Sequence, residues 1–182
     1  MAHFAQREFF RRLAEKYPVY FRDVRVLEVG SLDVNGSLRD LFGPPVWYTG
    51  IDLADGPGVD VVCPGHLFDT GIRYDTVISS EALEHDLHYR RTLGNLLRLL
   101  RPGGLLAISC ATTGRPEHGT RRSHPQDAPF LGLLGAEWGD YYRNLTEEEI
   151  REAIDIEASF ESHAFEIGVA ECDLYFWGIK RF

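Results

Sequence analysis

Short apolar runs alternate with amphipathic stretches along most of this chain. The first run, from Val24 to Val29, is apolar at most positions, which suits a parallel strand that is covered on both faces. Similar runs recur downstream, bounded by residues that favour turns. The pattern predicts five strands in the first 110 residues, at 24–29, 47–52, 59–62, 74–80 and 105–110.

Helical spacing of apolar residues fills several of the stretches around these strands. Pro18 ends the first predicted helix, and Gly43 with the two prolines after it ends the second. Thr146 is the expected N-cap of the last helix, with Glu149 as its capping-box partner. The expected helices cover residues 4–17, 35–42, 87–101 and 146–154.

Strands that alternate with helices predict an α/β protein with a mainly parallel sheet and helices on both faces. The end of the chain, 160–181, reads as two strands with no helical crossover between them. We expect these strands to form an antiparallel C-terminal pair that closes one edge of the sheet. A polar segment at 111–140 is long for a loop within a domain, and such loops are usually functional or disordered.

Composition restricts the setting of the protein. A chain of 182 residues with 44% hydrophobic residues fits one globular domain with one core. No apolar run approaches the ~20 residues of a membrane span, and the N-terminus lacks the apolar region of a signal peptide. Cys63, Cys110 and Cys172 are widely spaced, which predicts neither disulfides nor a zinc site. We therefore expect a cytoplasmic protein that does not contact a membrane.

Net charge bears on the choice of partner. The formal charge of −9 argues against a broad nucleic-acid-binding surface, which is normally basic. Arg115, Arg121 and Arg122 form the most local positive cluster, which is either a small anion site or a solvated loop. The sequence therefore favours a small molecule over nucleic acid as the partner.

The turn after the first strand carries the first chemical signal. Glu28 ends the strand and Gly30 follows it, where a glycine lets the backbone approach a ligand closely. The turn lacks the three glycines of the dinucleotide fingerprint, since Leu32 and Asn35 occupy the other two positions; this argues against an NAD-dependent enzyme. An acid two residues before the glycine suits a cationic ligand. A structural turn without a ligand is the alternative.

Glu28-x-Gly30 resembles the first motif of the class I S-adenosylmethionine (SAM)-dependent methyltransferases, although the chain departs from the usual glycine pattern after Gly30. Asp52 ends the second predicted strand, where an acid can accept the ribose hydroxyls of a nucleoside, and Leu53 would pack on the adenine. The third-strand region resembles the adenine-edge segment of the family, with Pro64 where an Asp is common. The expected cofactor-binding residues are Glu28, Gly30, Ser31, Asn35, Gly36, Asp52, Leu53, Cys63, His66 and Ser80.

Two further segments extend the resemblance. The exit of the fourth strand, from Glu81 to His85, is similar to the Glu-x-x-Glu-His segment of many small-molecule O-methyltransferases. The stretch 99–106 matches the helix-to-fifth-strand turn of the family. Four landmarks in the right order over 24–110 imply a single Rossmann-like methyltransferase domain. Within it, 1–20 would hold an N-terminal helix, 24–110 the SAM-binding core and 111–145 the acceptor-site loop.

The same exit segment raises the question of a metal. Glu81, Glu84, His85 and a later histidine, His118, resemble the set that holds a divalent ion in small-RNA 2′-O-methyltransferases. Carboxylates and imidazoles suit Mg²⁺ or Mn²⁺, which would lower the pKa of an acceptor hydroxyl. Alternatively, the two glutamates belong to the first turn of a helix, and His85 is a packing or acid–base residue.

The loop after the fifth strand begins beside the expected methyl donor. A hydroxyl is a poor nucleophile at neutral pH, so an O-methyltransferase needs a base or a metal, and histidine is the natural base. The preferred catalytic residue is His118, followed by His85, with Glu81 facing the acceptor. Glu117 and His124 are further candidate bases.

The expected function is O-methylation of a sugar or a small polar metabolite. Oxygen is favoured over nitrogen because the site is rich in bases and lacks the Asn/Asp-Pro-Pro-Tyr/Phe signature of many amino-N-methyltransferases. A metal-dependent RNA 2′-O-methyltransferase and a non-catalytic SAM-binding partner protein remain the alternatives. The small lid suggests an open acceptor site, for a large acceptor or for completion by a second subunit in an oligomer.

Overall fold

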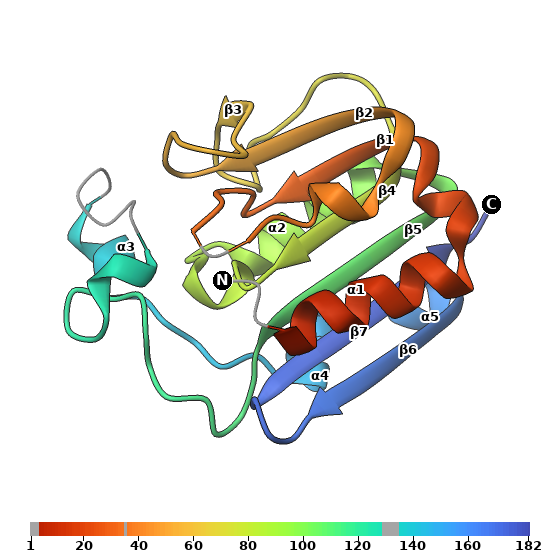
Figure 1. Ribbon diagram of the computed structural model, residues 1–182. Coiled ribbons are helices and arrows are strands. Elements are labelled where there is room, and N and C mark those ends of the chain that lie inside the picture. The colour runs from red at the N-terminus through yellow and green to blue at the C-terminus, as the bar shows by residue number, and fades with distance from the viewer. Residues whose placement is uncertain (1–3, 35, 129–134) are drawn as a thin grey trace.

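Seven strands of the described chain form one sheet in the computed structural model, which describes residues 4–34, 36–128 and 135–182. The order across the sheet is β3-β2-β1-β4-β5-β7-β6. The first five strands are mutually parallel, whereas β7 runs antiparallel to both β5 and β6 (Figure 1). The predicted parallel sheet with an antiparallel C-terminal pair is therefore confirmed.

The strands and helices follow the predicted alternation in most places. The strands are β1 (Arg22–Val29), β2 (Gly43–Asp52), β3 (Val61–Val62), β4 (Tyr74–Ser80), β5 (Leu100–Ala111), β6 (Phe160–Gly168) and β7 (Asp173–Lys180). The α-helices are α1 (Phe4–Lys16), α2 (Tyr89–Leu99), α3 (Ala136–Gly139), α4 (Glu147–Ala153) and α5 (Ile156–Ser159). Short 3₁₀ turns occur at Pro18–Tyr20, Arg39–Leu41, Leu83–His85 and Pro125–Asp127.

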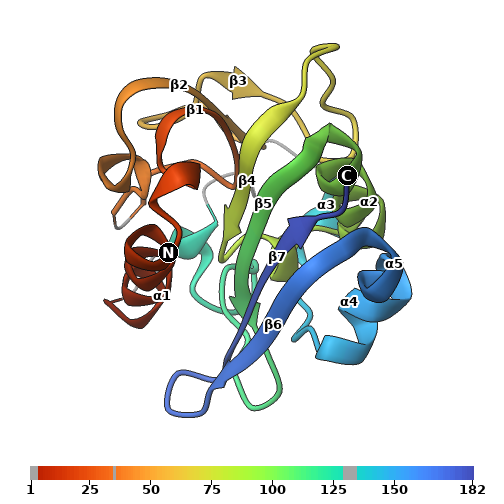
Figure 2. The same ribbon diagram turned by 90° about the vertical axis from the view of Figure 1, so that its right-hand side faces the viewer.

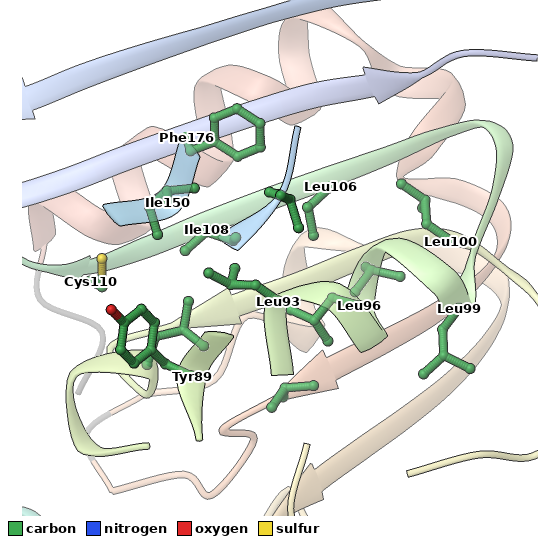
Figure 3. Close-up of a cluster of buried hydrophobic side chains, with 14 of the residues drawn as sticks. Tyr89, Leu93, Leu96, Leu99, Leu100, Leu106, Ile108, Cys110, Ile150 and Phe176 are labelled. Carbon is green, nitrogen blue, oxygen red and sulfur yellow. The ribbon is translucent and has the colours of Figure 1, made fainter. Parts of the chain in front are cut away.

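Helices cover both faces of the sheet, as predicted. Helix α1 lies on one face, and α2, α4 and α5 lie on the other (Figures 1 and 2). On the α2 face, leucines of the helix pack with residues of β5, α4 and β7 in one buried cluster (Figure 3). On the α1 face, Phe9, Phe10 and Leu13 are buried in a second cluster with Tyr175 and Trp177 of β7. The apolar spacing of these helices thus forms the core.

The segment between β1 and β2 differs from the prediction. A helix was expected over 35–42, but the described part of this segment is irregular apart from the 3₁₀ turn Arg39–Leu41. Its backbone donors bond elsewhere: the N–H of Asp33 donates to the carbonyl of Pro57 at 2.8 Å, and the N–H of Gly36 donates to the Asp33 carboxylate at 2.7 Å. Contacts with the neighbouring loop therefore replace the i→i−4 bonds of a helix.

The start of β2 also differs, because the two prolines that should break a helix lie within the strand. Pairing with β1 already begins at Gly43, whose N–H donates to Phe21 at 3.0 Å. Strand β3 pairs only with Ile51 and Asp52, so the beginning of β2 is a sheet edge among the described residues. A proline is tolerated at an edge, where its missing N–H breaks no ladder bond.

Other boundaries are close to the expected ones. Strand β4 spans the predicted residues, whereas β5 begins five residues earlier than predicted and β3 is two residues shorter. The capping box is confirmed, since Thr146 Oγ1 accepts from the Glu149 N–H at 3.3 Å and the Glu149 carboxylate accepts from the Thr146 N–H at 3.0 Å. No helix in the described part of the chain is long and apolar enough to cross a membrane.

Candidate functional site

Two adjoining hollows lie outside the carboxyl ends of β1, β2 and β4. The larger one, called the main cleft below, spans about 710 Å³ and the smaller one about 300 Å³, with the space open to solvent included. They share Gly30, Leu32 and Val34. The other residues of the main cleft are Val29, Asp52, Leu53, Cys63, Gly65, Glu81, Ala82, Leu83, His85, Asp86, Asp127, Ala128 and Trp138. Ligands of open α/β sheets bind at this edge.

Gly30 holds the turn between the two hollows. Its φ of +84° is disfavoured for L side chains, and a Cβ at this position would collide with the Cβ of Ala82. The N–H groups of Gly30 and Ser31 both donate to the carbonyl of Ile51, at 2.9 and 3.1 Å. Only a glycine therefore lets β1 and β4 exit side by side and leaves the cleft open.

Glu28 is buried at the wall of the smaller hollow. Its carboxylate accepts a hydrogen bond from the Tyr48 hydroxyl at 2.8 Å, and the Arg39 guanidinium lies over the Tyr48 ring. Burial raises the pKa of Glu28 to about 7, and the hydrogen bond from Tyr48 opposes part of that rise. The residue therefore changes charge near neutral pH.

Asp52 lies at the end of β2 and faces the main cleft. One carboxylate oxygen accepts from the Leu32 N–H and the other from the Ala54 N–H, both at 3.1 Å. Burial raises the pKa of Asp52, and the hydrogen bonds to backbone N–H groups oppose this. A carboxylate oxygen accepts more than one hydrogen bond, so both oxygens can still receive the hydroxyls of a ribose.

The remaining cofactor-binding candidates fall into four groups. Leu53 and Cys63 line the main cleft, and Ser31, Gly36 and Ser80 line the smaller hollow. His66 lines neither; its ring stacks edge-on against His88 with centroids 4.4 Å apart. Asn35 lies outside the described residues.

The exit of β4 brings unpartnered polar groups to the other end of the main cleft. Glu81 adopts a left-handed backbone conformation with φ of 51° and is 6% exposed. Neither of its carboxylate oxygens has a hydrogen-bond partner among the described residues. His85 also lines the cleft, and its Nδ1 is buried and equally unpartnered within the described chain. Buried polar groups without partners are uncommon and indicate a place for a ligand.

Three of the four predicted metal ligands come together. The ligand atoms of Glu84, His85 and His118 lie within 4.8 Å of one another. Glu81 is described by the structure but does not belong to this group. His118 packs on His85 with ring centroids 5.0 Å apart, but it does not line either hollow. The histidine nearest to a bound ligand would therefore be His85.

The electrostatics of this end follow from burial. Burial, and to a smaller extent the nearby His118, lower the pKa of His85 to about 3. Burial also raises the pKa of Glu81 well above its ordinary value, and the carboxyls of Glu84 and Asp173 add to the rise. His85 is therefore a neutral imidazole at physiological pH. Glu81 keeps its proton up to a higher pH than an ordinary carboxyl does.

The arginines of the loop are engaged by acids. Arg115 forms a 3.0 Å ion pair with the fully buried Asp173, which also accepts from Gln6 of α1 at 2.8 Å. Arg121 pairs with Asp140 through two nitrogens, and Arg122 pairs with Asp140 and with Glu117. None of the three lines the main cleft. His124 is exposed on the same loop, and Glu117 is held by Arg122.

Several cleft residues carry no recognisable sequence signal. Asp127, Ala128 and Trp138 come from the long loop, and Asp86 follows the exit of β4. Ala128 is buried with Ala54, and Leu32 and Leu53 pack against the pair, so the described loop residue Ala128 is held against the β2 side of the cleft. The length of the polar segment indicated a functional loop, but not which of its residues face the cleft.

Tyr142 was also missed. Its ring lies 5.5 Å from the His85 ring and 5.0 Å from the His118 ring, centroid to centroid. Its buried hydroxyl has no hydrogen-bond partner among the described residues. Tyr142 therefore fixes the packing of both histidines and leaves a donor beside them.

Comparison with known proteins places this geometry in a fold. No protein-family model matches the chain, and no curated protein is similar to it in sequence. Solved structures do match over nearly the whole chain. The CurJ carbon methyltransferase superposes with a TM-score of 0.60 at 19% identity, covering 97% of this chain and 53% of that one. The chain thus spans about half the length of that CurJ structure.

Two further matches cover more of the related structure. The N-methyltransferase NodS from Bradyrhizobium japonicum WM9, in complex with S-adenosyl-L-homocysteine (SAH), has a TM-score of 0.61 at 18% identity, covering 96% of this chain and 87% of that one. The N-terminal domain of EvdMO1, in the presence of SAH and D-fucose, has a TM-score of 0.63 at 17% identity, covering 100% of this chain and 85% of that one. The chain has the fold of the class I SAM-dependent methyltransferases. At these identities the likeness shows the fold alone.

Proposed function

We propose that this protein is a SAM-dependent O-methyltransferase that acts on a sugar or a small polar metabolite. The observation that carries the proposal is one continuous cleft, which runs from the Gly30 turn and Asp52 at one end to His85 at the other. The matched structures that contain SAH, one of them also in the presence of D-fucose, support a cofactor of this kind and a sugar-like acceptor.

The cofactor would occupy the end at β1 and β2. Asp52 would accept the ribose hydroxyls, and Leu53 would pack on the adenine. Glu28 and the Gly30 turn would receive the methionine end, where a carboxylate suits an ammonium group. SAM carries no phosphate, and the main cleft offers no described Lys or Arg to bind one.

The chemistry would take place beside His85. The acceptor oxygen attacks the sulfonium methyl in line, so that an O–CH₃ bond forms, the S–CH₃ bond breaks and SAH leaves. The attacking oxygen becomes strongly acidic as the O–CH₃ bond forms, so its proton passes at that stage to the neutral imidazole of His85 and then to water. A carboxyl of Glu84 lies within 4.8 Å of His85 and would stabilise the imidazolium. His118 and Tyr142 would hold the His85 ring, which makes His85 the preferred base, ahead of His118.

A metal-assisted version of this reaction has one observation in its favour. Glu84, His85 and His118 have their ligand atoms within 4.8 Å of one another, and both oxygens of Glu84 are unpartnered among the described residues. Carboxylate and imidazole ligands fit Mn²⁺ better than Mg²⁺, which prefers oxygen and water. When bound, the ion would lower the pKa of the acceptor hydroxyl.

Isothermal titration with SAM and SAH, with and without Mn²⁺, tests the cofactor and the metal. Micromolar affinity for both nucleosides supports the proposal, and a heat that requires Mn²⁺ and disappears in Glu84→Gln supports the metal. Absence of SAM and SAH binding refutes the methyltransferase function.

Substitution of the histidines tests the catalytic role. His85→Ala should lower turnover by about 10²- to 10⁴-fold with SAH affinity unchanged, and His118→Ala should lower it less. Equal turnover in wild type and His85→Ala refutes the assignment of the base. SAM binding without turnover on a broad panel of hydroxyl acceptors favours a non-catalytic SAM-binding protein.

A further inference from the structure

We infer that the acceptor of this protein carries an ammonium group, which Glu81 and Asp127 bind while a hydroxyl of the same molecule lies at His85. The inference rests on the proposed function, because it concerns the acceptor end of the same cleft. It names a substrate class, the amino alcohols and amino sugars, and it excludes phosphorylated acceptors.

The lining of the main cleft carries acids and no basic Lys or Arg among the described residues. The acidic residues of the main cleft are Asp52, Glu81, Asp86 and Asp127. The other ionisable residues of the lining are Cys63 and His85. A ligand with a negative charge would therefore find no Lys or Arg in the described lining, whereas a bound cation would favour the ionised form of these carboxyls.

Some carboxyls of the cleft already accept hydrogen bonds from the protein, and others do not. Asp52 accepts two backbone hydrogen bonds, and Asp86 accepts from the His88 N–H at 2.7 Å and from the Thr92 hydroxyl. Glu81 is 6% exposed with both oxygens unpartnered among the described residues. Asp127 is half-buried and its carboxylate makes no recorded hydrogen bond within the described chain. Glu81 is thus a buried carboxyl without a partner among the described residues, which is uncommon, and Asp127 adds a half-buried carboxyl to the same cleft.

An aromatic side chain lines the same cleft. Trp138 contributes to the wall, and its ring is fixed edge-on against His88 with centroids 5.5 Å apart. An indole attracts a cation through its π-system. Carboxylates together with an aromatic ring are the set of side chains that recognises an ammonium group.

The three arginines of the loop after β5 are all paired with acids. Arg115 is committed to the buried Asp173, and Arg121 and Arg122 are committed to Asp140 and Glu117. A phosphate or an RNA end would need such an arginine to be free. These ion pairs therefore make the loop a poor anion site and disfavour a nucleic-acid acceptor.

The chemistry of the amine decides where the methyl group goes. An adjacent carboxylate keeps an amine in its protonated form, which has no lone pair to attack the sulfonium. The ammonium would anchor the acceptor, and the uncharged hydroxyl beside His85 would be the nucleophile. The O–CH₃ bond forms and the proton of the hydroxyl leaves on His85, as in the proposed reaction.

Binding of charged probes to the SAH complex tests the inference without knowledge of the natural acceptor. The probes are D-glucosamine, D-glucose and D-glucose 6-phosphate, titrated into SAH-saturated protein and followed by calorimetry or by NMR of the Trp138 indole. Glucosamine should bind about 10- to 100-fold more tightly than glucose, the range expected for one charge-assisted hydrogen bond. Glucose 6-phosphate should bind most weakly. Equal affinities, or no detectable binding of glucosamine, overturn the inference.

Variants of two acids assign the preference to the cleft. Glu81→Gln should remove most of the preference for glucosamine with SAH affinity unchanged. Glu137→Gln, which alters an exposed carboxylate next to Trp138, is the matched control and should retain the preference. If Glu81→Gln weakens SAH binding instead, Glu81 receives the ammonium of the cofactor, which overturns the inference about the acceptor and leaves the proposed function standing. Failure of the wild type to bind SAH at all would refute the proposed function itself.

Discussion

The two ends of the main cleft satisfy their acids in opposite ways. At the end formed by β1 and β2, Asp52 is only half-buried, yet each of its oxygens holds a backbone N–H. At the exit of β4, Glu81 and Glu84 are buried, and none of their four oxygens has a partner among the described residues. The first end is a finished turn that maintains its own shape. The second is a set of groups that gain partners only from a ligand, which is how a binding site differs from a scaffold.

The largest effect is expected from a substitution at the end of the cleft formed by β1 and β2. Gly30→Val places a branched side chain at φ +84° and against Ala82, so it should cost several kcal/mol of unfolding free energy, of the order of 3 or more, and abolish SAH binding. Thermal denaturation and calorimetry measure both effects.

Gly94→Ala is the matched control, because a Cβ at this position in α2 meets nothing within 4 Å. It should leave SAH binding intact and change stability by no more than about 1 kcal/mol, in the stabilising direction. A Gly30→Val protein that folds and binds SAH normally would show that the turn does not need its glycine.

The pH dependence of the free protein comes next in size. The pKa of Glu28 is raised from 4.5 to about 7 in the folded state. Between these values the folded protein holds a proton that the unfolded chain has released, so stability falls as pH rises through this window. Glu28 accounts for up to about 3 kcal/mol of that fall, and buried Glu81 and Glu84 act in the same direction.

Chemical denaturation at pH 5 and pH 8 measures this fall. Glu28→Gln should flatten the profile, and Glu84→Gln should flatten it further at the acceptor end. A free protein that is equally stable at both values, or more stable at pH 8, contradicts the view that these carboxyls lack compensating charge.

A smaller difference is expected when one acid from each end is substituted and the stabilities of the two variants are compared. Asp52→Asn turns one carboxylate oxygen into a donor that faces a backbone donor, which should cost about 1–3 kcal/mol and weaken SAH binding. Glu84 makes no side-chain hydrogen bond among the described residues, and the backbone N–H groups of Glu84 and Ala111 only oppose the rise of its pKa. At pH 8, Glu84→Gln should therefore cost less than Asp52→Asn or stabilise the protein, although Glu84 is the more buried residue. Denaturation of both variants at pH 8 measures the difference. The reverse order of stabilities would erase the distinction between the two ends.

Local sequence patterns determined most of the elements. Strand β4, helix α1, the cap of α4 and the antiparallel C-terminal pair follow from apolar spacing and from capping residues such as Thr146. The predicted helix over 35–42 was wrong because donors such as the Asp33 N–H bond to the loop at Pro57, a contact that is distant in sequence. Local propensity cannot foresee such a competitor.

The residues of the site likewise fall into those that the sequence predicted and those that only the tertiary structure placed. Glu28, Gly30 and Asp52 could be predicted from the sequence, because each lies at the carboxyl end of a predicted parallel strand or directly after it, and these ends meet at one edge of the sheet. Only the tertiary structure decided that His85 lines the cleft while His118 stands behind it, and that His66 turns to His88. It alone showed that Asp127 and Trp138 line the cleft. The physical reason is that regular strands carry their side chains at fixed intervals, whereas a long loop takes its course from packing against residues far away in the sequence.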